Sequence, residues 1–135
     1  MISTDLALSL RDAGLVWHPA SGDRFQLDEP EFEADVFTVS EMTIEPRTYP
    51  TGTILAFNGT TEWALDSVAL EDALWLPRED QLRELLRGAF RRLERLADTH
   101  RVDIEFAGER QSFEHPQPED AYGLALLAVA VGLSV

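Results

Sequence analysis

The sequence predicts an α+β fold, with an antiparallel β-sheet of hairpins and helices packed on one of its faces. Short strand-like runs separated by turn residues occupy most of the chain up to Leu76, and the two strongest helix signals follow Pro77. Such segregation of strands and helices is typical of α+β domains and not of parallel βαβ sheets. The chain has 135 residues, 44% of them hydrophobic, which is enough for one sizeable core. We therefore expect residues 1–135 to form a single domain.

The first third of the chain predicts one short helix and two strands. Ser3 or Thr4 can cap the start of the helix, and Gly14 can end it. Residues 24–27 alternate between polar and apolar side chains, and residues 36–42 are rich in β-branched residues, so each range predicts a strand.

The clearest local signal is Asn58-Gly59, which separates two strand-like runs at residues 53–57 and 60–65. A type I′ turn needs positive φ at both central residues, and Asn-Gly meets this need well. The sequence therefore predicts a tight hairpin here, followed by a short strand at residues 73–76 that Pro77 ends.

Residues 78–97 leave two alternatives open. The spacing of leucine and alanine predicts one long helix opened by Pro77. Gly88 argues for an earlier end, in which case residues 90–96 form a strand that pairs with residues 102–106. Periodicity alone does not decide between the two.

The C-terminal third predicts a hairpin and a buried helix. Residues 101–106 alternate, and Gly108-Glu109 can turn the chain back into residues 110–113. Two prolines then lead into a helix whose body is residues 121–131. This segment is apolar nearly all round, so we expect it to be buried.

Composition excludes several classes of chemistry. The chain has no cysteine, which excludes disulfides, thiolate metal sites, iron–sulfur clusters and a cysteine nucleophile. All eleven basic residues are arginine, and the absence of lysine excludes a P-loop and Schiff-base chemistry. The net charge of −14 repels phosphate backbones, so we expect no nucleic acid partner. Eight of the eleven arginines lie in residues 77–135, which leaves residues 1–76 the more acidic half.

The sequence predicts a cytoplasmic protein without a membrane segment. Asp5 and the pair Arg11-Asp12 interrupt the apolar N-terminal residues, which argues against a secretory signal. The longest uncharged run, residues 121–135, is shorter than the roughly 20 apolar residues of a membrane-spanning helix.

Three segments carry a resemblance to a known family: residues 57–68 (FNGTTEWALDSV), 73–82 (ALWLPREDQL) and 118–127 (PEDAYGLALL). Together they resemble a family of small actinobacterial proteins of unknown function, over most of the chain, and some members are labelled pilus assembly protein of the CpaE type. Proteins that properly carry this label resemble much larger ATPases of the MinD type, which bind nucleotide through a lysine that this chain does not have. The resemblance implies a recurring fold with a break near Gly88, which favours the strand alternative for residues 90–96. It implies no catalytic residues.

We expect no metal and no cofactor. His18, His100 and His115 stand far apart in the sequence, without the spacing of a zinc site. The acidic segment at residues 28–35 holds five carboxylates but lacks the residue order of a calcium loop, so it predicts a solvated loop. The sequence contains neither the Gly-rich dinucleotide fingerprint nor a Gly-x-Ser-x-Gly elbow.

The candidate binding residues are tryptophans and two carboxylates. A tryptophan in a small domain can line a pocket or an interface as well as pack in a core, so Trp17, Trp63 and Trp75 are candidates. Glu62 and Asp66 lie beside Trp63 in the predicted hairpin, where burial would raise the pKa of one carboxyl group.

The C-terminal helix predicts self-association, because apolar residues occupy more than one of its faces. One stripe consists of Leu124, Leu127 and Val131. The second consists of Leu126, Val129 and Ala130. We expect the second stripe to meet a partner, for which a symmetric dimer is the commonest solution. The alternative, that loops or the first helix cover it within one chain, stays open.

The expected function is therefore a non-catalytic, cytosolic protein-interaction module, because no catalytic pattern stands out. The alternative is a small-molecule-binding protein or a carboxylate-dependent hydrolase with its site near Trp63. A cleft that holds a tryptophan and two convergent acids would favour this alternative, whereas an apolar surface patch would favour the module.

Overall fold

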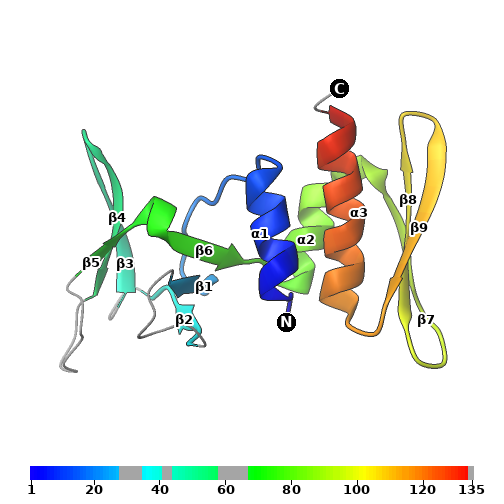
Figure 1. Cartoon of the computed structure of the whole chain (residues 1–135), viewed down its shortest axis with the longest axis horizontal. Coiled ribbons are helices and arrows are strands. Elements are labelled where there is room, and N and C mark those ends of the chain that lie inside the picture. Colours follow the sequence, from blue (N-terminus) through cyan, green and yellow to red (C-terminus); the bar gives the residue numbers. More distant parts are fainter. Residues whose placement is uncertain (28–34, 41–43, 58–66, 134–135) are drawn as a thin grey trace. The chain divides into compact units, whose positions relative to one another are not determined.

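The computed structural model describes residues 1–27, 35–40, 44–57 and 67–133, which form three α-helices and three small antiparallel sheets (Figure 1). The α+β class is as predicted, but the described strands are divided among three sheets instead of one. The chain forms two compact units. The helix unit contains Met1–Val16 and Pro77–Val135, and the strand unit contains Trp17–Leu76. The expectation of a single domain stays a prediction.

The first helix, α1 (Thr4–Asp12), begins and ends where the sequence predicts. The hydroxyl oxygen of Ser3 accepts a 3.3 Å hydrogen bond from the backbone N–H of Leu6, which caps the first turn. Gly14 follows the helix with φ of +110°, a conformation that favours glycine. Ala7 and Leu10 form its buried side.

The long helix predicted for residues 78–97 is wrong, and the strand alternative is confirmed. Helix α2 spans only Glu79–Leu86, and the short 3₁₀ turn η3 (Arg87–Ala89) leads into strand β7 (Phe90–Arg95). Arg87 has φ of 51°, which a right-handed helix cannot continue through. Beyond Arg87, the backbone groups of residues 90–95 form hydrogen bonds with a neighbouring strand, instead of the intrahelical hydrogen bonds that the apolar periodicity predicted.

Strand β7 belongs to a sheet with β8 (His100–Phe106) and β9 (Glu109–His115), in the order β7-β8-β9. Ala107 and Gly108 connect β8 and β9 with φ of 55° and 81°. Positive φ at both positions is the requirement of a type I′ turn. The hairpin is therefore confirmed, with its turn one residue earlier than predicted.

The last helix, α3 (Pro118–Leu133), packs on one face of this sheet, and α1 and α2 pack on other sides of α3 (Figure 1). Val102 and Ile104 are the buried residues of β8, and Ala121 and Ala125 are buried on α3. Gly123 lets α1 approach α3 closely, because a Cβ atom there would lie 2.6 Å from Cδ2 of Leu6. Among the described residues, no helix has both the length and the apolar character needed to cross a membrane.

The strand unit contains one sheet in the order β2-β1-β6. Its strands are β2 (Phe37–Thr38), β1 (Arg24–Leu27) and β6 (Ala73–Leu76). The predicted strands at 24–27 and 73–76 are confirmed, whereas the one predicted over 36–42 is short, with residues 41–43 outside the described part. The 3₁₀ turn η2 (Leu70–Asp72) precedes β6.

The other sheet of the strand unit has the order β3-β4-β5. It contains β3 (Ile44–Tyr49), β4 (Gly52–Phe57) and β5 (Ser67–Ala69). The turn predicted at Asn58-Gly59 and the strand predicted after it lie outside the described residues, so this hairpin stays a prediction. Among the described residues, Ala56 of β4 is paired with Glu45 on one edge and with Ser67 on the other. A tight turn between Tyr49 and Gly52 connects β3 to β4.

The core of the strand unit is partly aromatic. Its buried residues are Trp17, Phe25, Leu27, Val39, Ile44, Leu55 and Ala73. Phe37, Leu70 and Trp75 are partly buried and pack against this cluster.

Candidate functional site

Two of the predicted binding residues, Trp17 and Trp75, stack on each other in the strand unit. Their ring centroids are 6.4 Å apart and their planes differ by 9°. Trp17 is 8% exposed and its ring also lies 5.5 Å from that of Phe25. The stack is therefore part of the core, which is the ordinary role of a buried tryptophan.

The predicted acids near Trp63 lie outside the described residues. Glu62, Trp63 and Asp66 all fall within residues 58–66, so the hydrolase alternative stays a prediction. Of the three candidate tryptophans, Trp75 has a buried Nε1 atom that forms no hydrogen bond with the described residues.

A buried carboxylate that the sequence analysis did not single out lies beside Trp17. Asp23 is 3% exposed, and its Oδ2 accepts hydrogen bonds from Nε1 of Trp17 at 2.9 Å and from the backbone N–H of Ala20 at 3.0 Å. The carboxylate holds the loop between Trp17 and β1 in place. No signal in the spacing of acids could have distinguished Asp23 from the many solvated ones.

The fold brings together two histidines that the sequence separates. His100 and His115 face each other across β8 and β9, and Nε2 of His115 lies 3.6 Å from Oδ2 of the buried Asp120. His18 is exposed in the strand unit. The other oxygen of Asp120 accepts a 2.8 Å hydrogen bond from the backbone N–H of Ser3.

The serine, histidine and aspartate near this point are not arranged for hydrolysis. Nδ1 of His115 accepts a 3.0 Å hydrogen bond from the backbone N–H of Gln117, so the neutral ring carries its proton on Nε2, towards Asp120. Neither nitrogen then has a lone pair that could take a proton from a serine. The hydroxyl of Ser3 is itself the cap of α1. The arrangement joins α1, β9 and α3 and serves as a structural anchor.

A groove lies over the open side of α3, between α1 and the end of β9, with a volume of about 310 Å³. We call it the α3 groove. It is lined by Ser3, Asp5, Leu6, Ser9, His115, Asp120, Leu124 and Leu127. Val131 shares the stripe of Leu124 and Leu127 and is 54% exposed. The floor of the groove is therefore apolar, and its rim is polar.

The predicted interface residues lie on another side of α3. Leu126 is 7% exposed, and Val129 and Ala130 are half-buried. All three line an apolar hollow of about 340 Å³ together with residues of α1, α2 and the segment that follows α1. Elements of the same chain cover most of this stripe, so Leu126 is not a surface residue. The stripe that stays more open is Leu124, Leu127 and Val131.

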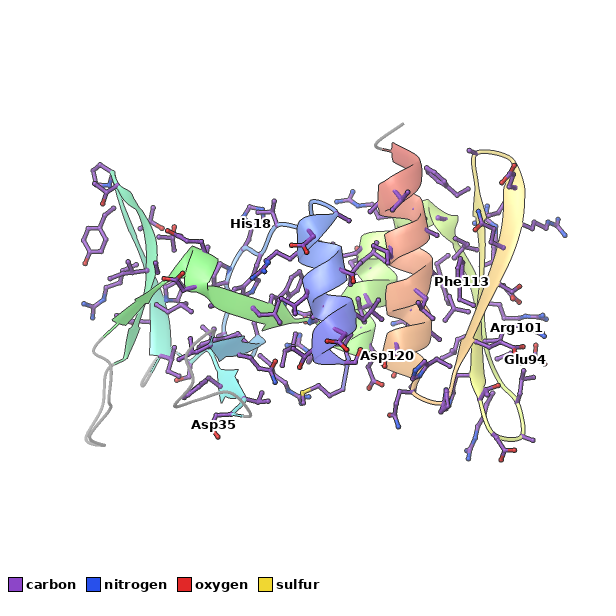
Figure 2. All side chains as sticks on the ribbon, viewed as in Figure 1. His18, Asp35, Glu94, Arg101, Phe113 and Asp120 are labelled. Carbon is purple, nitrogen blue, oxygen red and sulfur yellow. The ribbon has the colours of Figure 1, made fainter. Side chains whose placement is uncertain are left out.

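The sheet β7-β8-β9 carries charged side chains on the face that points away from α3, which we call the outer face. Figure 2 shows Glu94 and Arg101 on this side and Phe113 on the side of α3. The outer face consists of one serine, Ser112, and eight charged residues: Arg91, Arg92, Glu94, Arg101, Asp103, Glu105, Arg110 and Glu114. A hollow of about 590 Å³ in this face is lined mainly by its arginines, Asp103 and Glu105.

Ion pairs connect the outer face across the three strands. Nη2 of Arg92 lies 3.0 Å from Oδ2 of Asp103, and Nε of Arg101 lies 3.3 Å from Oδ1 of the same carboxylate. Arg101 also donates a hydrogen bond to Glu94. The hydroxyl of Ser112 donates a 2.6 Å hydrogen bond to Asp103, and this bond together with the two arginines lowers the pKa of Asp103 below its ordinary value.

Sequence analysis missed the outer face, although two signals pointed to it. Most arginines lie after Leu76, and the odd-numbered residues of β8 are charged while the even-numbered Val102 and Ile104 are apolar. The missing information was the strand assignment of residues 90–95, without which Arg92 and Glu94 could not be placed beside Asp103 and Arg101.

Comparison with known proteins finds no matching family model, no similar curated protein and no similar solved structure. The resemblance to the actinobacterial family of unknown function therefore stays a prediction. Within the part of the chain that the structure describes, no group of three or more histidine, aspartate or glutamate residues is placed to hold a metal ion.

Proposed function

We propose that this protein is a non-catalytic interaction module of the cytoplasm, which binds a protein partner through the α3 groove and pairs with a second copy of itself. The observation that carries the proposal is the more open apolar stripe of α3, in which Leu124 and Leu127 are half-buried and Val131 is exposed. Leu124 and Leu127 line the groove, and Val131 is 54% exposed.

The composition of the α3 groove supports a protein partner. Leucine side chains form its floor, and serine, aspartate and histidine side chains surround them. An apolar centre with a polar rim is the usual composition of a protein–protein contact. Asp5 is exposed at this rim, so a partner that places a basic side chain beside its apolar anchor would be favoured.

The chemistry of the polar rim argues against catalysis at the same place. Both nitrogens of His115 are engaged, one with the backbone of Gln117 and one towards Asp120. Asp120 in turn accepts the N–H of Ser3. These groups hold three elements of the helix unit together and have no proton-accepting position directed into the groove.

Site-specific photo-cross-linking in the native cell tests the proposal. A benzophenone amino acid at Val131 should give a defined adduct with a protein, because this position extends the apolar stripe. The same amino acid at Asp98, an exposed position between β7 and β8, is the matched control and should give none. The Val131 adduct should weaken when Leu127→Asn is added while the circular dichroism spectrum is unchanged. Absence of an adduct at Val131, or equal adducts at both positions, would contradict the proposal.

A further inference from the structure

The charged residues of the outer face lie in three rows that cross the strands. The first row carries positive, negative and positive charge, and consists of Arg91, Glu105 and Arg110. The middle row consists of Arg92, Asp103 and Ser112. The last row carries negative, positive and negative charge, and consists of Glu94, Arg101 and Glu114. The first and last rows are therefore of opposite charge at each strand.

We infer that the outer face is an interface between two copies of this chain, related by a two-fold axis that runs across the strands along the middle row. This inference rests on the proposed function and assigns the surface through which the module pairs with itself. Rotation about such an axis places the first row of one copy against the last row of the other. Each charge of the first row then meets an opposite charge of the partner, on all three strands.

The charge balance of the face favours this partner. Its four arginines and four carboxylates cancel, whereas the whole chain carries −14. Two such chains repel each other over most of their surfaces, and the repulsion is smallest where a neutral, alternating face meets its own copy. Complementary charge patterns also fix the relative orientation of two partners.

The middle row lies on the axis and would meet itself, but its charges are already neutralised within the chain. Arg92 and Asp103 pair at 3.0 Å, and Ser112 donates to the same carboxylate. No unpaired like charges are therefore brought together at the axis. The hollow of about 590 Å³ in this face gives room for long side chains of the second copy.

Arg110 and Glu114 give the sharpest test of this arrangement. Both lie on β9, four residues apart, so their Cα atoms are separated by about 13 Å and they cannot pair within one chain. The side chain of Arg110 is 88% exposed, with its Nε 3.8 Å from Glu105, and Glu114 is exposed. In the two-fold arrangement, Arg110 of each copy faces Glu114 of the other.

The experiment compares Arg110→Glu, Glu114→Arg and the double variant by light scattering behind a sizing column and by analytical ultracentrifugation. Each single variant places like charges together at two symmetric positions and should raise the dissociation constant of the dimer by at least about tenfold. The double variant exchanges the two charges and should restore the dimer. An equimolar mixture of the two single variants should form a heterodimer, because every contact between residues 110 and 114 is then again between opposite charges.

The circular dichroism spectrum should be unchanged in all variants, since both positions are exposed, and the melting temperature should fall only in the variants that lose the dimer. A dimer that persists in both single variants would overturn the assignment to the outer face but leave self-association standing. A wild-type chain that stays monomeric would overturn self-association itself, while the cross-link at Val131 reports separately on the α3 groove. Failure of the double variant and of the mixture to dimerise would overturn the two-fold arrangement.

Discussion

Nε1 of Trp17 donates a 2.9 Å hydrogen bond to Oδ2 of Asp23, and both side chains are buried in the strand unit. Hydrogen bonds to charged groups stabilise proteins more than neutral ones, and a buried carboxylate that loses a donor becomes costly. The pair therefore links the core of this unit to the loop that precedes β1.

Trp17→Phe should lower the free energy of unfolding by about 1.5–3 kcal/mol, because it removes the N–H donor while keeping an aromatic ring. Urea denaturation followed by circular dichroism measures the change. In an Asp23→Ala background the same replacement should cost much less, because the partner is already gone. Equal costs in both backgrounds would show that packing, and not the hydrogen bond, accounts for the loss.

Gly123→Ala should destabilise the helix unit, although alanine normally stabilises a helix interior by about 1 kcal/mol relative to glycine. The new Cβ would lie 2.6 Å from Cδ2 of Leu6, so α1 or its side chain has to shift. In a Leu6→Ala background the contact is relieved and Gly123→Ala should become stabilising. A stabilising effect in the wild-type background would contradict the close approach of α1 to α3.

Ala107→Asn should raise the melting temperature. Ala107 has φ of 55° in the turn between β8 and β9, a region that costs alanine about 1–2 kcal/mol and that asparagine tolerates better. Gly108→Ala is the matched control, and it should lower the melting temperature because Gly108 has φ of 81°. The same sign of change in both variants would contradict a type I′ turn.

These cases show which parts of the fold could be predicted from the sequence. Capping by Ser3, the end of α1 at Gly14 and the strands at 24–27 and 73–76 depend on local residue chemistry, and all are confirmed. The division of residues 78–97 into a helix and a strand depends on the positive φ of Arg87 and on pairing with β8. The spacing of apolar residues predicts neither of these.

The turn predicted at Asn58-Gly59 lies outside the described residues and stays a prediction. At α3, the outcome was set by tertiary context. Apolar residues all round α3 correctly predicted burial. Which stripe stays open depends on the positions of α1 and α2. Leu126, predicted to lie at an interface, is 7% exposed, whereas Val131 on the other stripe is 54% exposed.

Acid should weaken the fold partly through Asp103. The hydrogen bond from Ser112 and the two arginines lower the pKa of this carboxyl group in the folded chain below its ordinary value of 3.8. A lowered pKa contributes stability that is fully present above the ordinary value and is lost as pH falls through the folded value. Asp103→Asn should therefore be less stable than wild type at neutral pH, and the difference should shrink as pH falls below about 4. A constant difference down to the acid transition, in urea titrations at several pH values, would contradict this role.

The most direct test of the account is the mass of the unaltered chain as a function of salt. Two chains of −14 each repel most strongly at very low ionic strength, so the test starts at about 0.15 M, where the Debye length of about 8 Å screens distant charges more than contacting ones. Because the proposed dimer depends on opposite charges in contact across the outer face, light scattering at this ionic strength should give about twice the chain mass of 15.1 kDa. In about 1 M salt, where the Debye length is about 3 Å, the mass should fall towards that of one chain. A single-chain mass at about 0.15 M ionic strength, or a dimer that tightens between about 0.15 M and 1 M salt, would contradict the claim that this module pairs through its charged sheet face.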